Sequence, residues 1–152
     1  IGANLGTTFS GILFVDNSFL IGHVGDTRIY HIGNSMNQLT EDQTVIAREI
    51  SRGNLTIEQA KRDKRRNMLL QCIGASRVVM PQILYGTLEP GAYMLCSDGF
   101  RHEITEGEMY QTLNASNLMD KQVMRNKVRY LIDLVKSRQE RDNISVVLIK
   151  AE

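Results

Sequence analysis

Hydrophobic and polar positions divide the chain into three stretches with different patterns. The first third is rich in strand-forming residues, in runs that end at the turn clusters Asp16-Asn17-Ser18 and Gly33-Asn34-Ser35. This pattern predicts strands over residues 9–15, 19–24 and 29–32. Because the connections are very short, we expect these strands to be antiparallel neighbours in a β-meander.

The middle third has the spacing of short helices. Ile46 and Ile50 share one helical face, Glu41-Asp42 suits the N-terminus of a helix, and Gly53-Asn54 suits its end. The capping-box form of residues 56–59 predicts a second short helix.

The last third mixes both kinds of element. Residues 82–88, 92–96 and 144–149 are predicted strands, and residues 105–113 are a predicted helix. A longer helix is predicted from one apolar stripe over residues 124–135. The order of elements predicts an α/β (α+β) fold, an antiparallel β-sandwich flanked by helices.

Composition narrows the functional classes. The 152 residues carry a net charge of +1, and 42% of them are hydrophobic, which suits one ordinary domain and gives no reason to expect a polyanionic partner. No apolar run approaches the roughly 20 residues of a membrane helix, so no membrane contact is expected. Cys72 and Cys96 are far apart and suggest reduced thiols in a cytoplasmic protein. The first residue is Ile1, so we expect a piece of a longer chain.

Three aspartates stand at the ends of predicted strands. Asp26 and Asp98 each follow a strand, and Asp142 precedes one. Any one of them, followed by Thr, Gly or Asn, also fits an ordinary turn. Together, carboxylates that converge from strand ends suit a hard divalent cation such as Mg²⁺ or Mn²⁺, whose charge offsets their mutual repulsion.

Six short motifs follow one another over nearly the whole chain. They are Gly6-Thr7-Thr8, Gly25-Asp26-Thr27-Arg28, Leu39-Thr40-Glu41-Asp42-Gln43, Arg66-Asn67-Met68-Leu69 with Ile73-Gly74, Ser97-Asp98-Gly99-Phe100 and Asp142-Asn143-Ile144-Ser145-Val146-Val147. Each motif alone is weak, but the six in this order resemble the motifs of the PPM family, the type 2C metal-dependent protein serine/threonine phosphatases.

The resemblance implies a metal site and a reaction. Asp98 and Asp142 match ligands of one ion in a dinuclear pair, and Asp26 matches an aspartate that helps to hold a third, weaker ion beside Asp98. Asn143 would orient its loop. The complete domain would use two or three Mn²⁺ or Mg²⁺ ions, and metal-activated water would hydrolyse phosphoserine or phosphothreonine in a phosphoprotein substrate.

The sequence also departs from the family pattern. The family has an upstream Asp-Gly-x-Gly-Gly motif that bridges the metals, but the only Asp-Gly pair here is Asp98-Gly99, and Gln43 stands where the family often has His. We therefore expect residues 1–152 to be a partial catalytic domain, truncated at the N-terminus and inactive alone, with a flap over about residues 41–74. Open sheet edges would pair with the missing N-terminal half or with a second copy.

Two other functions stay open at this stage. A noncatalytic phosphatase-like interaction module would bind phosphoproteins or partner domains without turnover. Residues 61–66 contain five basic side chains in six and could form a nucleic-acid patch, but the rest of the chain is not basic, so no nucleic-acid partner is expected. His102 could approach the cleft beside Asp98.

Overall fold

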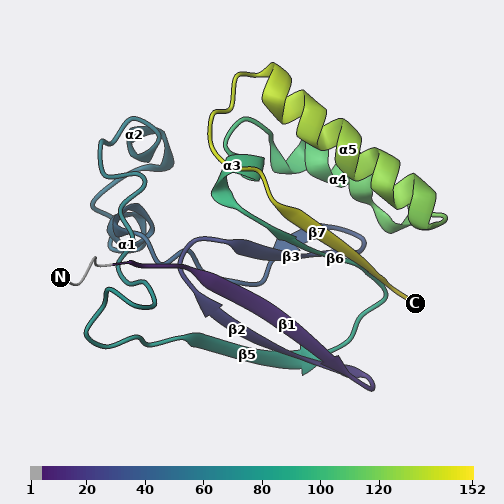
Figure 1. The fold of residues 1–152 in the computed structure, drawn as a ribbon, viewed down its shortest axis with the longest axis horizontal. Helices are drawn as coiled ribbons and strands as arrows, with labels where there is room; N and C mark the ends of the chain where they lie inside the picture. The colour runs from purple at the N-terminus through teal and green to yellow at the C-terminus, as the bar shows by residue number, and fades with distance from the viewer. Residues whose placement is uncertain (1–4) are drawn as a thin grey trace.

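The computed structural model describes residues 5–152, which form two packed antiparallel sheets with helices on one outer side and at one end (Figure 1). The three-stranded sheet has the order β1-β2-β5, with β1 at Phe9–Val15, β2 at Ser18–Val24 and β5 at Gln82–Thr87. The four-stranded sheet has the order β4-β3-β6-β7, with β3 at Arg28–Ile32, β4 at Met36–Gln38, β6 at Gly91–Cys96 and β7 at Val146–Ala151. The predicted antiparallel sandwich is confirmed.

Five α-helices and one 3₁₀ turn are found in residues 5–152. The helices are α1 at Val45–Ser51, α2 at Ile57–Ala60, α3 at Asp98–Arg101, α4 at Glu106–Leu113 and α5 at Lys121–Ser137, and the 3₁₀ turn is η1 at Ala115–Asn117. Threonine caps α1, α2 and α4, and full capping boxes form at Thr56 and Thr105. In the described residues, no helix is long and apolar enough to cross a membrane.

The predicted meander is wrong at its second connection. β1 and β2 pair as expected, but β3 lies in the other sheet beside β4 and β6. The chain changes sheet at Gly25, whose φ of +116° is strained for a residue with a side chain. A Cβ there would also lie 2.3 Å from Thr8 Cγ2, so this corner requires glycine. Short connections can therefore pass between sheets as well as within one.

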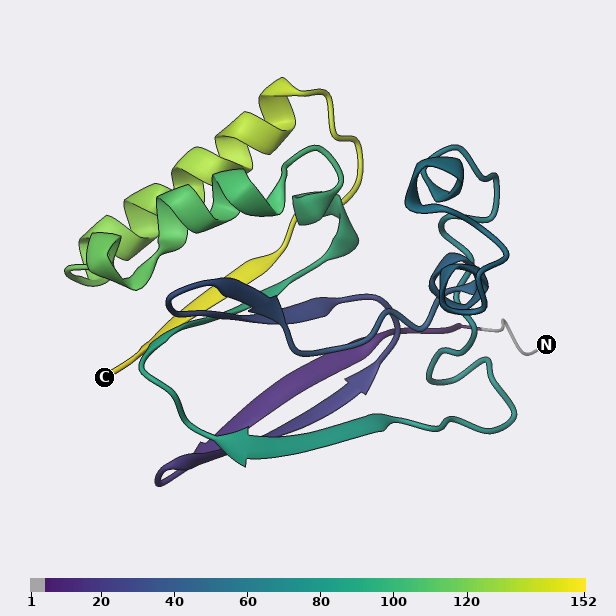
Figure 2. The same ribbon diagram turned by 180° about the vertical axis from the view of Figure 1, so that it is seen from behind.

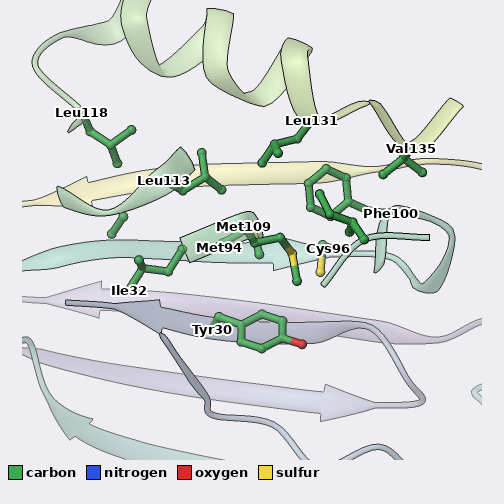
Figure 3. Close-up of a cluster of buried hydrophobic side chains, with 12 residues drawn as sticks. Tyr30, Ile32, Met94, Cys96, Phe100, Met109, Leu113, Leu118, Leu131 and Val135 are labelled. Carbon is green, nitrogen blue, oxygen red and sulfur yellow. The ribbon is translucent and has the colours of Figure 1, made fainter. Parts of the chain in front are cut away.

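The main core lies between the four-stranded sheet and the helices α4 and α5 (Figure 3). Leu131 and Val135 of α5 are fully buried, and Met124 and Val128 pack against the same cluster. The apolar stripe predicted for this helix therefore faces the sheet. This packing fixes β6 and β7, whose ends carry two of the three candidate aspartates.

The opposite side of the sandwich is uncovered. In Figures 1 and 2, α4 and α5 lie over the four-stranded sheet, whereas no helix of residues 5–152 lies over the far side of the three-stranded sheet. We call this far side the outer face. Alternation along the paired strands places six exposed large apolar side chains on it, and each is at least 45% exposed: Phe9, Leu13, Val15, Leu20, Ile83 and Tyr85.

Residues 41–74 form a separate excursion from the sandwich, which we call the 41–74 segment. It contains α1 and α2, which lie together at one end of the sheets (Figures 1 and 2). Its two ends are joined by backbone hydrogen bonds from Val45 N to Met68 O, 2.9 Å, and from Leu70 N to Gln43 O, 2.8 Å. The segment is thus closed at its base.

Candidate metal site

Asp98 sits where β6 ends and α3 begins. Ser97 takes extended backbone angles as the residue before the helix, and Asp98 opens the helix. One carboxylate oxygen, Oδ1, accepts a hydrogen bond of 2.8 Å from the Gly99 N–H. The other oxygen, Oδ2, lies 3.8 Å from His102 Nε2 and accepts no hydrogen bond from residues 5–152. A half-buried carboxylate is thus held with one oxygen open to a ligand.

Asp142 is brought beside Asp98 by contacts of the backbone and of Ser97. The Ser97 hydroxyl donates to Asn143 O at 3.1 Å and accepts from Ser145 N at 3.0 Å, and Ser97 N donates to Ser145 O at 2.9 Å. Gly99 packs so closely that a Cβ would lie 2.5 Å from Asn143 O and 3.1 Å from Asp142 Cβ. Asp98 and Asp142 are therefore neighbours although 44 positions separate them in the sequence.

The loop that carries Asp142 is shaped by Glu140. One Glu140 oxygen, Oε1, accepts hydrogen bonds from the backbone N–H groups of Arg141, at 2.7 Å, and Asp142, at 2.8 Å. These bonds and the nearby His102, whose Nδ1 is 3.3 Å from Glu140 Oε2, lower the pKa of Glu140. Asp142 Oδ1 in turn accepts from Asn143 N at 2.7 Å. The expected role of Asn143 in its loop remains a proposal.

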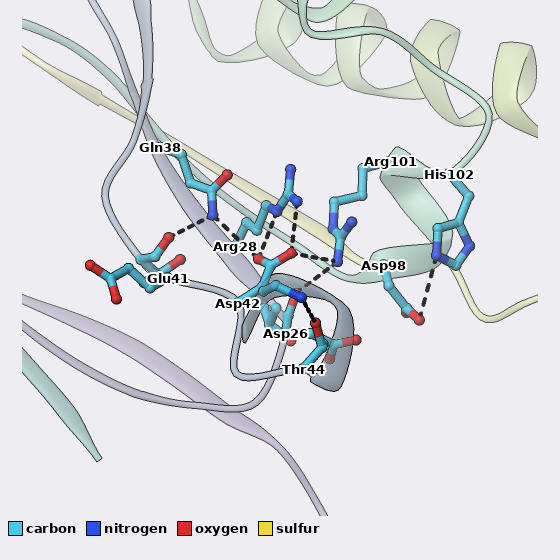
Figure 4. Close-up of polar contacts among 12 residues, drawn as sticks. Asp26, Arg28, Gln38, Glu41, Asp42, Thr44, Asp98, Arg101 and His102 are labelled. Atoms are coloured by element: carbon cyan, nitrogen blue, oxygen red, sulfur yellow. Dashed lines mark hydrogen bonds and ion pairs between the residues drawn. The ribbon is translucent and has the colours of Figure 1, made fainter. Parts of the chain in front are cut away.

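Asp26 lies at the corner between β2 and β3, half-buried and next to a network of ion pairs (Figure 4). Arg28 binds both oxygens of Asp42 at 2.8 and 2.7 Å. Arg101 donates from Nη2 to the carbonyl of Asp26 at 3.1 Å and lies 3.6 Å from Asp42 Oδ2. Asp42, predicted at the N-terminus of a helix, therefore pairs with arginines instead, and Thr44 caps α1.

The two carboxyl groups of this corner have opposite pKa shifts. Burial raises the pKa of Asp26 above its usual value, and the negative charge of Asp98 raises it further, while Arg101 opposes both. Burial also acts to raise the pKa of Asp42, but the hydrogen bonds from Arg28 and the charge of Arg101 outweigh it, so this pKa is lowered. The carboxyl group of Asp26 therefore lies close enough to Asp98 for the charge of Asp98 to raise its pKa.

A cleft of about 730 Å³ opens beside Asp142. One wall is the 41–74 segment, with Lys61, Arg66 and Asn67, and the other holds His102 and the loop that carries Asp142. Within the described residues, Arg66 forms no ion pair. The cleft therefore joins part of the basic stretch to Asp142, and His102 is among the residues that line it.

Comparison with known proteins agrees with the motifs. No protein-family model matches the chain. A protein of Streptococcus pyogenes, provisionally named as a type 2C protein phosphatase, is 32% identical over 151 residues, which cover 97% of this chain and 59% of that protein. The serine/threonine phosphatase of S. agalactiae has a solved structure with 28% identity and a TM-score of 0.87, covering 97% of this chain and 60% of the other.

A third protein bears on the metal. The catalytic domain of the serine/threonine protein phosphatase PstP, solved with two manganese ions, is 26% identical with a TM-score of 0.78, covering 94% of this chain and 57% of that one. Identity and fold thus agree over nearly the whole chain. In sequence and in fold, the chain is similar to type 2C protein serine/threonine phosphatases. It spans about 57–59% of the length of the curated PPM relatives that it matches.

The side chains that could bind metal show how much of a PPM metal pair this chain could hold. Among residues 5–152, no three His, Cys, Asp or Glu side chains converge in the arrangement of a metal site. Asp98 and Asp142 nevertheless each keep one oxygen without a hydrogen bond from these residues, and hard cations need such oxygens. The residues fit part of a metal site, and further ligands would have to come from outside them.

Some of the site was not anticipated from the sequence. The pairing of Arg28 with Asp42 and the approach of Arg101 to Asp26 were not predicted. Arg101 directly follows the Ser97-Asp98-Gly99-Phe100 motif, and its side chain meets Asp26 only because α3 and the β2–β3 corner are adjacent. The sequence did offer one signal for Arg101: it is a basic residue about one helical turn after the candidate ligand Asp98.

Proposed function

We propose that this chain is part of a catalytic domain that hydrolyses phosphoserine and phosphothreonine in proteins with the help of Mn²⁺ or Mg²⁺. The observation that carries the proposal is the pairing of Asp98 with Asp142 through Ser97 and Gly99, at the mouth of a cleft. The similarity to type 2C protein phosphatases supports the reaction class. The two manganese ions of the PstP structure support the choice of metal.

In this proposal, Asp98 and Asp142 hold one ion of a metal pair, and Asp26 with Asp98 holds a third, weaker ion. Bound metal would supply an activated water and stabilise the charge of the phosphate. The chain's own residues have supporting tasks. Ser97 and Gly99 fix the distance between the two carboxylates, and Glu140 holds the backbone of the loop that carries Asp142.

Substrate would enter along the cleft beside Asp142. Residues 61–66 carry five basic side chains, and Lys61 and Arg66 line the wall of the cleft. A basic wall raises the local concentration of a phosphoprotein by electrostatic attraction. We therefore assign the 41–74 segment as a flap that borders the active site and contacts the polypeptide around the phosphorylated residue.

A partner segment is part of the proposal. The chain offers two aspartates for a metal that normally takes about six oxygen ligands, and its outer face leaves six large apolar side chains exposed. β1 and β5 are also open edges of their sheet. We infer that the rest of a PPM domain covers this face and supplies the missing ligands, and that the chain alone is inactive. Association of two copies through the same face is the alternative.

The test is hydrolysis of p-nitrophenyl phosphate and of a phosphothreonine peptide with Mn²⁺. The chain would be assayed alone and joined to an upstream segment that carries the Asp-Gly-x-Gly-Gly motif. We expect activity only in the joined protein, and loss of at least a hundredfold on Asp98→Asn, since metal-derived stabilisation accounts for several kcal/mol of the barrier. Asp16→Asn, in the exposed turn between β1 and β2, is the matched control and should leave activity unchanged.

The second function is a noncatalytic module that binds phosphoproteins. It is favoured by the absence of a third converging ligand within residues 5–152. It predicts that the joined protein binds the phosphopeptide but does not hydrolyse it at any Mn²⁺ concentration. Hydrolysis that depends on Asp98 and Asp142 would reject it.

A further inference from the structure

Arg101 holds a positive charge at the corner formed by three aspartates. It is the last residue of α3, and its side chain is only 15% exposed. Figure 4 shows its guanidinium directed toward Asp42 and Asp26. Nη2 donates to the carbonyl of Asp26 at 3.1 Å and lies 3.6 Å from Asp42 Oδ2. The guanidinium of Arg101 thus lies beside Asp26, the residue proposed to hold the third ion with Asp98.

Asp42 does not need this second arginine. Arg28 already donates to both of its oxygens, at 2.8 and 2.7 Å, in a bidentate pair. Arg101 therefore brings a second cation to a carboxylate whose two oxygens already accept hydrogen bonds from Arg28. The Nε of Arg101 is buried and has no hydrogen-bond partner in residues 5–152. An unsatisfied buried donor is costly. Attraction to the nearby carboxylate of Asp26 offsets that cost.

We propose that Arg101 competes with a divalent cation for the corner formed by Asp26 and Asp98. Its guanidinium neutralises part of the charge that would otherwise attract the third ion. The repulsion between a guanidinium and a divalent ion a few ångströms apart lowers the affinity of that ion. The inference rests on the proposed function only in taking Asp26 and Asp98 as the ligands of that ion.

The consequence is a metal site whose affinity is set by one residue of the chain. With Arg101 in place, the Asp26 corner stays nearly free of metal at concentrations that fill the Asp98–Asp142 pair. Without it, Asp26 and Asp98 keep their charge, and the volume of the guanidinium becomes available to an ion and its waters. The third ion would then bind on the order of tenfold more tightly or better.

The test is a titration of the 152-residue chain with Mn²⁺, in which free Mn²⁺ is measured by electron paramagnetic resonance. Arg101→Met should gain one ion with at least tenfold higher affinity than the original chain shows, and the double variant Arg101→Met with Asp26→Asn should lose this gain. Arg101→Lys keeps the charge and should gain nothing. Equal Mn²⁺ binding by Arg101→Met and the original chain, or a gain that persists in the double variant, would overturn the proposal.

Two further measurements keep the result decisive. Arg125→Met removes the same charge from an exposed position of α5, so a gain there would show a general charge effect and overturn the proposal. If circular dichroism shows that Arg101→Met is unfolded, Arg101→Gln replaces it with the same expected result. Asp142→Asn reports separately on the Asp98–Asp142 pair, so a failure of the proposed function is distinguished from a failure of the role of Arg101.

Discussion

The hydroxyl of Ser97 donates to the carbonyl of Asn143 at 3.1 Å and thereby ties the end of β6 to the loop before β7. The same hydroxyl accepts a hydrogen bond from Ser145 N at 3.0 Å. The Ser97 side chain therefore acts as both donor and acceptor to the loop before β7. Asp98 follows Ser97, and Asp142 precedes Asn143. The separation of the two proposed metal ligands therefore depends on a serine that binds no metal itself.

Replacement of Ser97 tests this dependence. Ser97→Ala removes both hydrogen bonds, so we expect a loss of about 1–2 kcal/mol in the free energy of unfolding, measured by denaturant titration. We also expect weaker Mn²⁺ binding. Ser137→Ala is the matched control, because that hydroxyl bonds only to Leu134 O at the exposed end of α5. Equal behaviour of the two variants would contradict the role given to Ser97.

Gly99 offers a steric test of the same contact. Gly99→Ala would place a Cβ 2.5 Å from Asn143 O, a backbone atom that cannot move without shifting the Asp142 loop. We expect a cost of about 2–3 kcal/mol from overpacking, together with loss of Mn²⁺ binding. Gly107→Ala in α4 meets nothing closer than 3.9 Å and should stabilise the chain by up to about 1 kcal/mol. Thermal unfolding of the two variants measures the difference.

Local patterns predicted the elements better than their assembly. Turn clusters and capping boxes act over a few residues, so β1, β2, β5, α4 and α5 were found at or within a few residues of their observed ends. The switch of β3 to the second sheet depends on the contact between Gly25 and Thr8, which no local pattern encodes.

The site was predictable to a similar extent. The motifs selected Asp26, Asp98 and Asp142 because the family pattern carries them. Arg101 could not be selected in the same way, because its role depends on two elements 75 positions apart that become adjacent only in the fold.

The pair of Arg28 and Asp42 predicts a dependence of stability on pH. The pKa of Asp42 is lowered in the fold, so its stabilising contribution is present above the unfolded value of 3.8 and is lost as the pH falls through the lower folded value. Asp42→Asn should cost about 3 kcal/mol at pH 7, because it leaves Arg28 largely buried without its carboxylate. The difference from the original chain should shrink below about pH 4. A difference that stays constant between pH 7 and pH 3 would show that the ion pair contributes nothing.

The outer face predicts how the isolated chain behaves in solution. Tyr85 is 85% exposed on this face, so Tyr85→Lys should reduce self-association and raise solubility without a loss of stability. Tyr130→Lys changes an equally large, 58% exposed side chain on α5, away from the outer face, and is the control. Sedimentation velocity distinguishes the two. A strictly monomeric original chain would argue against self-association, and the covering segment would then have to come from the rest of a PPM domain.

Arg66 tests the basic wall of the cleft. In the joined, active protein, Arg66→Ala should raise KM for an acidic phosphopeptide several-fold and leave KM for p-nitrophenyl phosphate unchanged, since the small substrate does not extend along the wall. Arg62→Ala, also in the basic stretch but outside the cleft lining, is the control. An equal rise of KM for both substrates would contradict this role and would mean that Arg66 acts on the reacting phosphate.

The central claim is that Asp98 and Asp142 hold a metal ion when the domain is complete. The most direct measurement is a crystal structure of the joined protein grown with Mn²⁺, in which anomalous scattering locates the ions. We predict a Mn²⁺ ion within coordination distance of both carboxylates, with its remaining ligands supplied by the joined segment and by water. A fully occupied Mn²⁺ pair that contacts neither aspartate, or no ion at this corner at saturating Mn²⁺, would contradict the account.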